Sequence, residues 1–146
     1  MYNESAYKAT YGEMVRLVCP FEKAILSRCA DCELARKFNI AEREAVACSA
    51  AAASENCKIL HGLLHQNALF ALKLNQPLTA LPHAKELKIQ CGGLLGIRHL
   101  IDHEAPLCEN VHALIGPLQA RYESLTALPW NEVVKEITSF EGRRRR

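Results

Sequence analysis

Apolar residues recur three and four positions apart along most of the chain, and this spacing is typical of amphipathic helices. Prolines at positions 20, 82 and 129 stand at the start of three of these periodic stretches, where proline suits the first turn of a helix. The pattern predicts helices over residues 4–18, 21–28, 54–74, 82–101, 111–125 and from 129 to about 140.

Strand signals are weak by comparison. The chain has no sustained alternation of apolar and polar residues, and no Asn-Gly or Asp-Gly pair that would close a hairpin. Residues 40–47 are predicted to form a short helical piece or a turn, and Gly116-Pro117 predicts a kink or break within the helix over 111–125. We therefore expect an all-α fold, a single-domain irregular helical bundle of five to seven helices.

The chain of 146 residues is long enough for one domain, which we place at residues 1–142. Arg143 to Arg146 form a basic tail that we expect to be disordered, and they supply four of the 18 Lys and Arg residues. Without them, 14 basic residues face 16 acidic ones, a net charge of −2. This balance does not fit a dedicated nucleic-acid binder, although the tail could add weak, non-specific contacts with phosphates.

The compartment decides how the 7 cysteines are interpreted. The first residues show no secretory signal pattern, and charged residues interrupt the apolar stretches well short of a membrane span, so we expect a cytoplasmic protein without membrane contact. Thiols are kept reduced there, and grouped cysteines are then more often metal ligands or redox groups than structural disulfides.

Five of the cysteines follow the pattern C-x9-C-x2-C-x15-C-x8-C in the first half of the chain. The central pair, Cys29 and Cys32, can present two sulfurs to one ion or cluster, and further sulfurs would come from elements that the fold brings together. Four-cysteine zinc sites usually have two such tight pairs, whereas the larger inorganic core of an iron–sulfur cluster tolerates ligands spread singly. We therefore expect a 4Fe–4S cluster in the N-terminal half, with zinc as the alternative. The predicted ligands are Cys19, Cys29, Cys32 and Cys48, with Cys57 as the substitute.

A metal-free interpretation also stands, because free cysteine often fills a core as a small apolar residue. Cys91 and Cys108, which lie apart from the other five, are best explained in this way. The metal-free interpretation does not suit the central pair. Cys29 and Cys32 lie among charged residues, where we do not expect buried apolar side chains.

Two pairs of histidines four residues apart, His61/His65 and His99/His103, have the spacing of metal-binding helices. A helical wheel places Cys57 and His61 on the inward face and His65 at its rim, so His61 is a further candidate ligand in a mixed site. None of these four histidines follows a glutamate at the spacing Glu-x-x-His, and in most helical proteins such histidines are not ligands.

Two further features concern packing and catalysis. The glycines at positions 92 and 96 share one helical face, which suits the close approach of a neighbouring backbone or of a bulky cofactor. No Ser/His/Asp grouping and no paired-carboxylate arrangement stands out, so the sequence does not indicate an enzyme.

These features favour an iron–sulfur protein that acts in electron transfer or in redox or oxygen sensing. Phe21, Phe38 and Ile40 would exclude water from the cluster, and the charged residues over 28–37 would contact a protein redox partner. One alternative is a zinc-stabilised interaction or regulatory module whose arginine tail touches nucleic acid. A second alternative is a metal-free helical adaptor.

Overall fold

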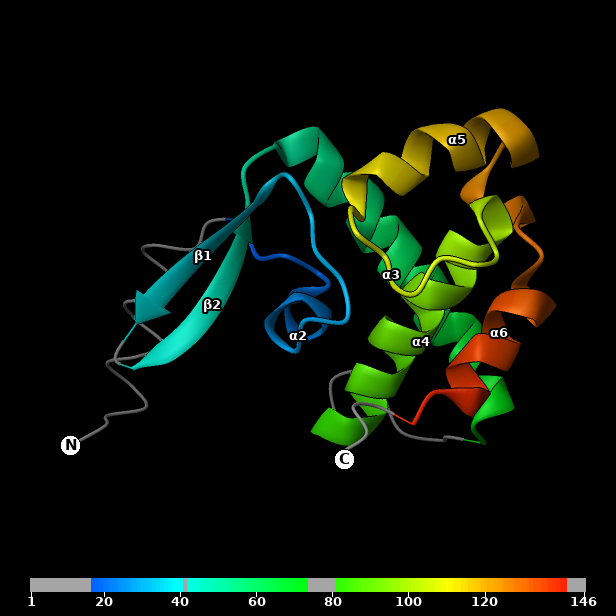
Figure 1. The fold of residues 1–146 in the computed structure, drawn as a ribbon, viewed down its shortest axis with the longest axis horizontal. Coiled ribbons are helices and arrows are strands. Elements are labelled where there is room, and N and C mark those ends of the chain that lie inside the picture. The colour runs from blue at the N-terminus through cyan, green and yellow to red at the C-terminus, as the bar shows by residue number, and fades with distance from the viewer. Residues whose placement is uncertain (1–16, 41, 74–80, 142–146) are drawn as a thin grey trace.

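The computed structural model describes residues 17–40, 42–73 and 81–141, and Figure 1 shows their arrangement. A β-hairpin stands beside a body of helices, and the short helix α2 lies between the hairpin and α4 (Figure 1). In chain order the elements are α2 (Glu22–Leu26), β1 (Ala35–Ile40), β2 (Arg43–Cys48), α3 (Ala51–Ala71), α4 (His83–Ile101), α5 (His112–Tyr122), the 3-10 helix η2 (Leu125–Ala127) and α6 (Trp130–Ser139).

The hairpin corrects the all-α prediction, because the fold is mostly helical but mixed. β1 and β2 pair antiparallel from Ala35 opposite Cys48 to Ile40 opposite Arg43, so the helical piece or turn expected over 40–47 is wrong. The turn uses Glu42 with a φ of 70° instead of an Asn-Gly pair. β2 is buried at three successive residues, which hides the period of two that identifies a strand in sequence.

The second edge of β2 is also covered. Val18 forms a bridge with Ala47, and the backbone of Cys48 donates to the carbonyl of Leu17 at 2.7 Å. The segment before α2 therefore pairs with β2, and these long-range hydrogen bonds stabilise a hairpin that is poor in β-branched residues.

The other helix predictions agree with the structure apart from their ends. α3 begins three residues earlier than predicted and ends three earlier, α4 covers 83–101, and α5 contains Pro117 without being divided there. The predicted helix over 4–18 falls almost entirely outside the described residues, as does the basic tail 143–146. None of the helices in the described ranges has both the length and the apolar character needed to cross a membrane.

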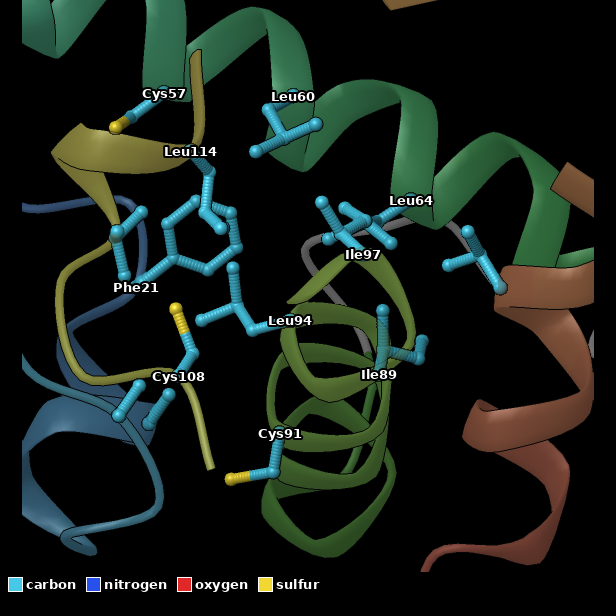
Figure 2. Close-up of a cluster of buried hydrophobic side chains, with 14 of the residues drawn as sticks. Phe21, Cys57, Leu60, Leu64, Ile89, Cys91, Leu94, Ile97, Cys108 and Leu114 are labelled. Atoms are coloured by element: carbon cyan, nitrogen blue, oxygen red, sulfur yellow. The ribbon is translucent and has the colours of Figure 1, made fainter. Parts of the chain in front are cut away.

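One core joins the helices (Figure 2). Leu60 and Leu64 on α3 face Leu94 and Ile97 on α4, and all four side chains are fully buried. A smaller cluster of Ile40, Ala45 and Ala47 lies under Phe38 in the hairpin.

The prediction that Gly92 and Gly96 allow the close approach of a neighbouring backbone is confirmed. A Cβ atom added at Gly92 would lie 2.7 Å from Ile137 Cα, and one added at Gly96 would lie 3.0 Å from Val133 Cα. Both contacts are with the backbone of α6, so the two glycines set the distance between α4 and α6.

Candidate functional site

Four cysteines from four separate segments line one small cavity of about 20 Å³. Cys19 precedes α2, Cys32 follows it in the loop to β1, Cys48 ends β2, and Cys57 lies on α3. Three of them are half-buried and Cys57 is buried. The fold therefore brings together sulfur-bearing side chains that are up to 38 residues apart in the chain.

Hydrogen bonds fix the segments that carry Cys19 and Cys32. The N–H of Cys19 donates to the carbonyl of Val46 at 3.1 Å, and this bond holds the start of α2 against β2. In the loop after α2, the N–H of Cys32 donates to Asp31 Oδ1 at 2.8 Å. The same loop is tied to the segment before α5, because the N–H of Val111 donates to the carbonyl of Asp31 at 2.9 Å.

The remaining cavity wall is mostly apolar. Phe21, Ala53 and Val111 line it and are buried, so the cavity is largely shielded from water. Ser54 also lines the cavity and is 1% exposed, and its Oγ has no hydrogen-bond partner among the described residues. A buried hydroxyl without a partner is costly, and here it stands beside the four sulfurs.

The electrostatics of the site disfavour free thiolates. Burial, with smaller contributions from the neighbouring Cys32 and Cys48, raises the pKa of Cys19 to about 11, although the backbone N–H of Phe21 acts in the opposite direction. Burial likewise raises the pKa of Cys57 to about 12, again with a contribution from the other three thiols. A cation bound by Cys19 and Cys57 would therefore have to displace the protons of these two thiols.

The spacing of the sulfurs is wider than a single ion requires. Among the described residues, no three cysteine sulfurs lie within 4.8 Å of one another. Tetrahedral zinc with Zn–S bonds of about 2.3 Å places its four sulfurs about 3.8 Å apart. The thiols are thus grouped around one cavity without forming a preassembled single-ion site.

Cys29, a predicted ligand, lies elsewhere. It forms a disulfide with Cys91 on α4, 62 residues away, and it does not line the cysteine cavity. The disulfide also corrects the interpretation of Cys91 as a simple core residue, although Cys91 is buried. Cys108 is fully buried and free, as expected of a core cysteine. Figure 2 shows the Cys91 sulfur pointing away from Leu94, whereas the Cys108 sulfur points toward it.

A second group of side chains joins α3 to α4. His61 Nε2 lies 2.9 Å from Glu86 Oε2, and His65 Nε2 lies 2.7 Å from Glu86 Oε1. Of all described residues, only His61, His65 and Glu86 form a group of three or more candidate metal ligands within 4.8 Å of one another. The helical wheel was wrong about the two histidines, since the side chain of His65 is 1% exposed and that of His61 is 25% exposed.

Glu86 and Gln90 complete this group and were missed by the sequence analysis. Gln90 Nε2 donates to Glu86 Oε2 at 2.7 Å, and Gln90 Oε1 accepts from the N–H of Ala24 at 3.0 Å. Burial acts to raise the pKa of Glu86, but the neighbouring side chains of His61, His65 and Gln90 together hold that pKa well below its usual range. A signal existed, because Glu86 lies three residues before the fully buried Ile89 on the inward face of α4.

The second histidine pair forms no comparable group. His99 Nε2 lies 2.8 Å from the carbonyl of Ala105, its Nδ1 lies 3.3 Å from Glu136 Oε1, and His103 is exposed.

No protein-family model matches the chain, and no curated protein and no solved structure shows significant similarity to it. The functional argument therefore depends on the two groups of side chains themselves.

Proposed function

We propose that the protein binds a 4Fe–4S cluster through Cys19, Cys32, Cys48 and Cys57 and acts in electron transfer or in redox or oxygen sensing. The observation that carries this proposal is the grouping of four cysteines from four segments around one mostly apolar cavity. Cys57, the substitute in the sequence analysis, takes the place of Cys29.

The donor set fits an iron–sulfur cluster better than zinc. Four thiolates are the usual ligands of a 4Fe–4S cluster, and its large core holds the ligand sulfurs farther apart than one zinc ion does. Ser54 Oγ, which has no partner in the described part of the chain, would find an acceptor in a cluster or ligand sulfur. The cavity of about 20 Å³ has room for about one water molecule, so the cysteine side chains must turn outward to admit the core.

The position of the cavity fits a role in electron exchange. Cys19, Cys32 and Cys48 are only half-buried, which places the site near the surface. Exposed charged residues surround Cys32 in the chain, from Arg28 to Lys37. We propose this charged segment as the contact for a protein redox partner, since complementary charge steers such encounters.

We propose the cytoplasm as the compartment. Stable disulfides are rare there, and those that occur are usually transient or redox-active. In this compartment, the Cys29–Cys91 disulfide would be the oxidised state of a cysteine pair that cytosolic thiols can reduce.

The test is anaerobic reconstitution of the full chain with iron and sulfide, followed by iron and sulfide analysis and an absorption spectrum. The proposal expects about four iron and four sulfide ions per chain and a brown colour that dithionite bleaches. Cys57→Ser should lower the iron content sharply. Cys108→Ser is the matched control, because Cys108 is also a buried thiol with a pKa raised to about 12 by burial but does not line the cavity.

Three results would contradict the proposal. A colourless protein with one tightly bound zinc would favour the zinc-stabilised module, and a protein that binds neither metal would favour the metal-free adaptor. Equal iron loss in Cys57→Ser and Cys108→Ser would show that unfolding, rather than ligation, explains the effect.

A further inference from the structure

We propose that His61, His65 and Glu86 form a second metal site, which takes one divalent transition-metal ion such as Zn²⁺ and is distinct from the cysteine cavity. The three ligand atoms lie within 4.8 Å of one another. Two histidines four residues apart on α3 supply the imidazoles, and α4 supplies the carboxylate. Two imidazoles and one carboxylate are a donor set that recurs in zinc and iron sites.

The side chain of His65 gives independent support for a ligand. It is 1% exposed, and neither of its ring nitrogens has a hydrogen-bond partner of acceptable geometry in the described structure. Glu86 Oε1 is 2.7 Å from Nε2, but this close contact is not a hydrogen bond. A buried imidazole in this state loses the hydrogen bonds that water would give it, and a metal ion bound to Nε2 would recover that free energy.

The distances require only a small adjustment. Tetrahedral zinc bonded to nitrogen and oxygen at about 2.0–2.1 Å separates its ligand atoms by about 3.3 Å. The two nitrogen–oxygen distances are 2.9 and 2.7 Å, so the ligands must move apart by about half an ångström to admit an ion.

Neighbouring residues already hold the ligands in orientation. Gln90 donates to Glu86 and accepts from the backbone of α2, and this chain of bonds fixes the carboxylate between three helices. The rings of His61 and Phe21 form a T-shaped pair, with ring centroids 5.5 Å apart. Such supporting contacts are typical of metal sites, in which outer residues orient the ligands.

The site has an entry path. His61, Glu86 and Gln90 line an open hollow of about 440 Å³ whose other walls include Lys23 and Leu81. Three protein ligands leave the fourth position of a tetrahedral ion free, and this position would face the hollow. The bound ion could therefore hold a water molecule or an anionic ligand and act as a Lewis acid.

The experiment uses zinc titration calorimetry on the full chain carrying Cys32→Ser and Cys48→Ser, so that the cysteine cavity does not compete for the ion. The expected result is one Zn²⁺ per chain, with the affinity reduced about tenfold or more by His61→Ala or by Glu86→Gln. His99→Ala is the matched control, because His99 also lies beside a carboxylate, Glu136, but has no second imidazole there. Absence of binding, or equal binding by all three variants, would overturn the proposal.

A second measurement uses the unmutated histidines and so does not depend on the folding of a variant. Zinc should shift the ring ¹⁵N resonances of His61 and His65 and leave those of His99 in place. Shifts confined to other histidines would contradict the site.

Discussion

Replacing Gly92 with alanine tests the close contact of α4 and α6, on which the position of Glu86 and Gln90 depends. The added Cβ would lie 2.7 Å from Ile137 Cα and 3.0 Å from the carbonyl oxygen of Glu136. Non-bonded carbon atoms are normally about 3.5–4.0 Å apart, so the two helices must separate by about 1 Å. The obstacle is backbone, which cannot rotate out of the way as the end of a side chain can.

The magnitude follows from two opposing effects. Overpacking of this kind costs about 1–3 kcal/mol, and alanine regains up to about 1 kcal/mol through its higher helix propensity. With the full gain subtracted, Gly92→Ala should destabilise the protein by up to about 2 kcal/mol. Gly62 is the matched control, because it lies within α3 and a Cβ added there meets nothing within 4 Å. Gly62→Ala should stabilise the protein by about 0.5–1 kcal/mol.

Urea denaturation followed by circular dichroism measures both variants against the parent protein. The expected outcome is a change of opposite sign at the two positions, with the midpoint lowered for Gly92→Ala and raised for Gly62→Ala at an unchanged m-value. If alanine stabilised the protein equally at both positions, the close contact between α4 and α6 would be absent and the reasoning would be refuted.

Three further predictions concern the disulfide, one ion pair and the cluster. Replacing both Cys29 and Cys91 with alanine should lower the free energy of unfolding of the oxidised protein by up to about 4 kcal/mol, because the bond closes a loop across 62 positions. The iron content after reconstitution should not change, and loss of iron would restore Cys29 as a ligand. A hydrogen bond from Arg98 lowers the pKa of Glu109 to about 2 from its usual 4.5. The difference in stability between the parent protein and Glu109→Gln should therefore be present above pH 4.5 and vanish as the pH falls toward 2. A difference independent of pH would contradict this. Ser54→Ala should lower the reduction potential of the bound cluster, since a hydrogen bond to sulfur favours the reduced form, and an unchanged potential would show that Ser54 does not reach the cluster.

The helix positions could be predicted from the sequence, because the periodicity of apolar residues in the helices agrees with the way the helices pack. Both Gly92 and Gly96 meet the backbone of α6, as their shared helical face predicted. The hairpin could not be predicted, because the burial of Ala45, Val46 and Ala47 depends on contacts that form only when the chain folds. In these contacts α2 packs against β2, and Val18 pairs with Ala47.

The candidate sites could be predicted only in part. The cysteine spacing singled out Cys19, Cys32 and Cys48, which line one cavity, but it could not exclude Cys29, because the partner of Cys29 lies 62 residues away on α4. Glu86 was missed for a related reason. The motif sought for the histidines required a glutamate on the same helix, whereas the fold supplies it from the neighbouring one.

X-ray absorption at the iron edge of anaerobically purified, unsubstituted protein tests the central claim most directly, because it identifies the atoms bonded to iron. The account predicts that sulfur alone is bonded to the iron, together with scattering from neighbouring iron atoms. Iron bonded only to nitrogen and oxygen, or a protein devoid of iron, would contradict the claim.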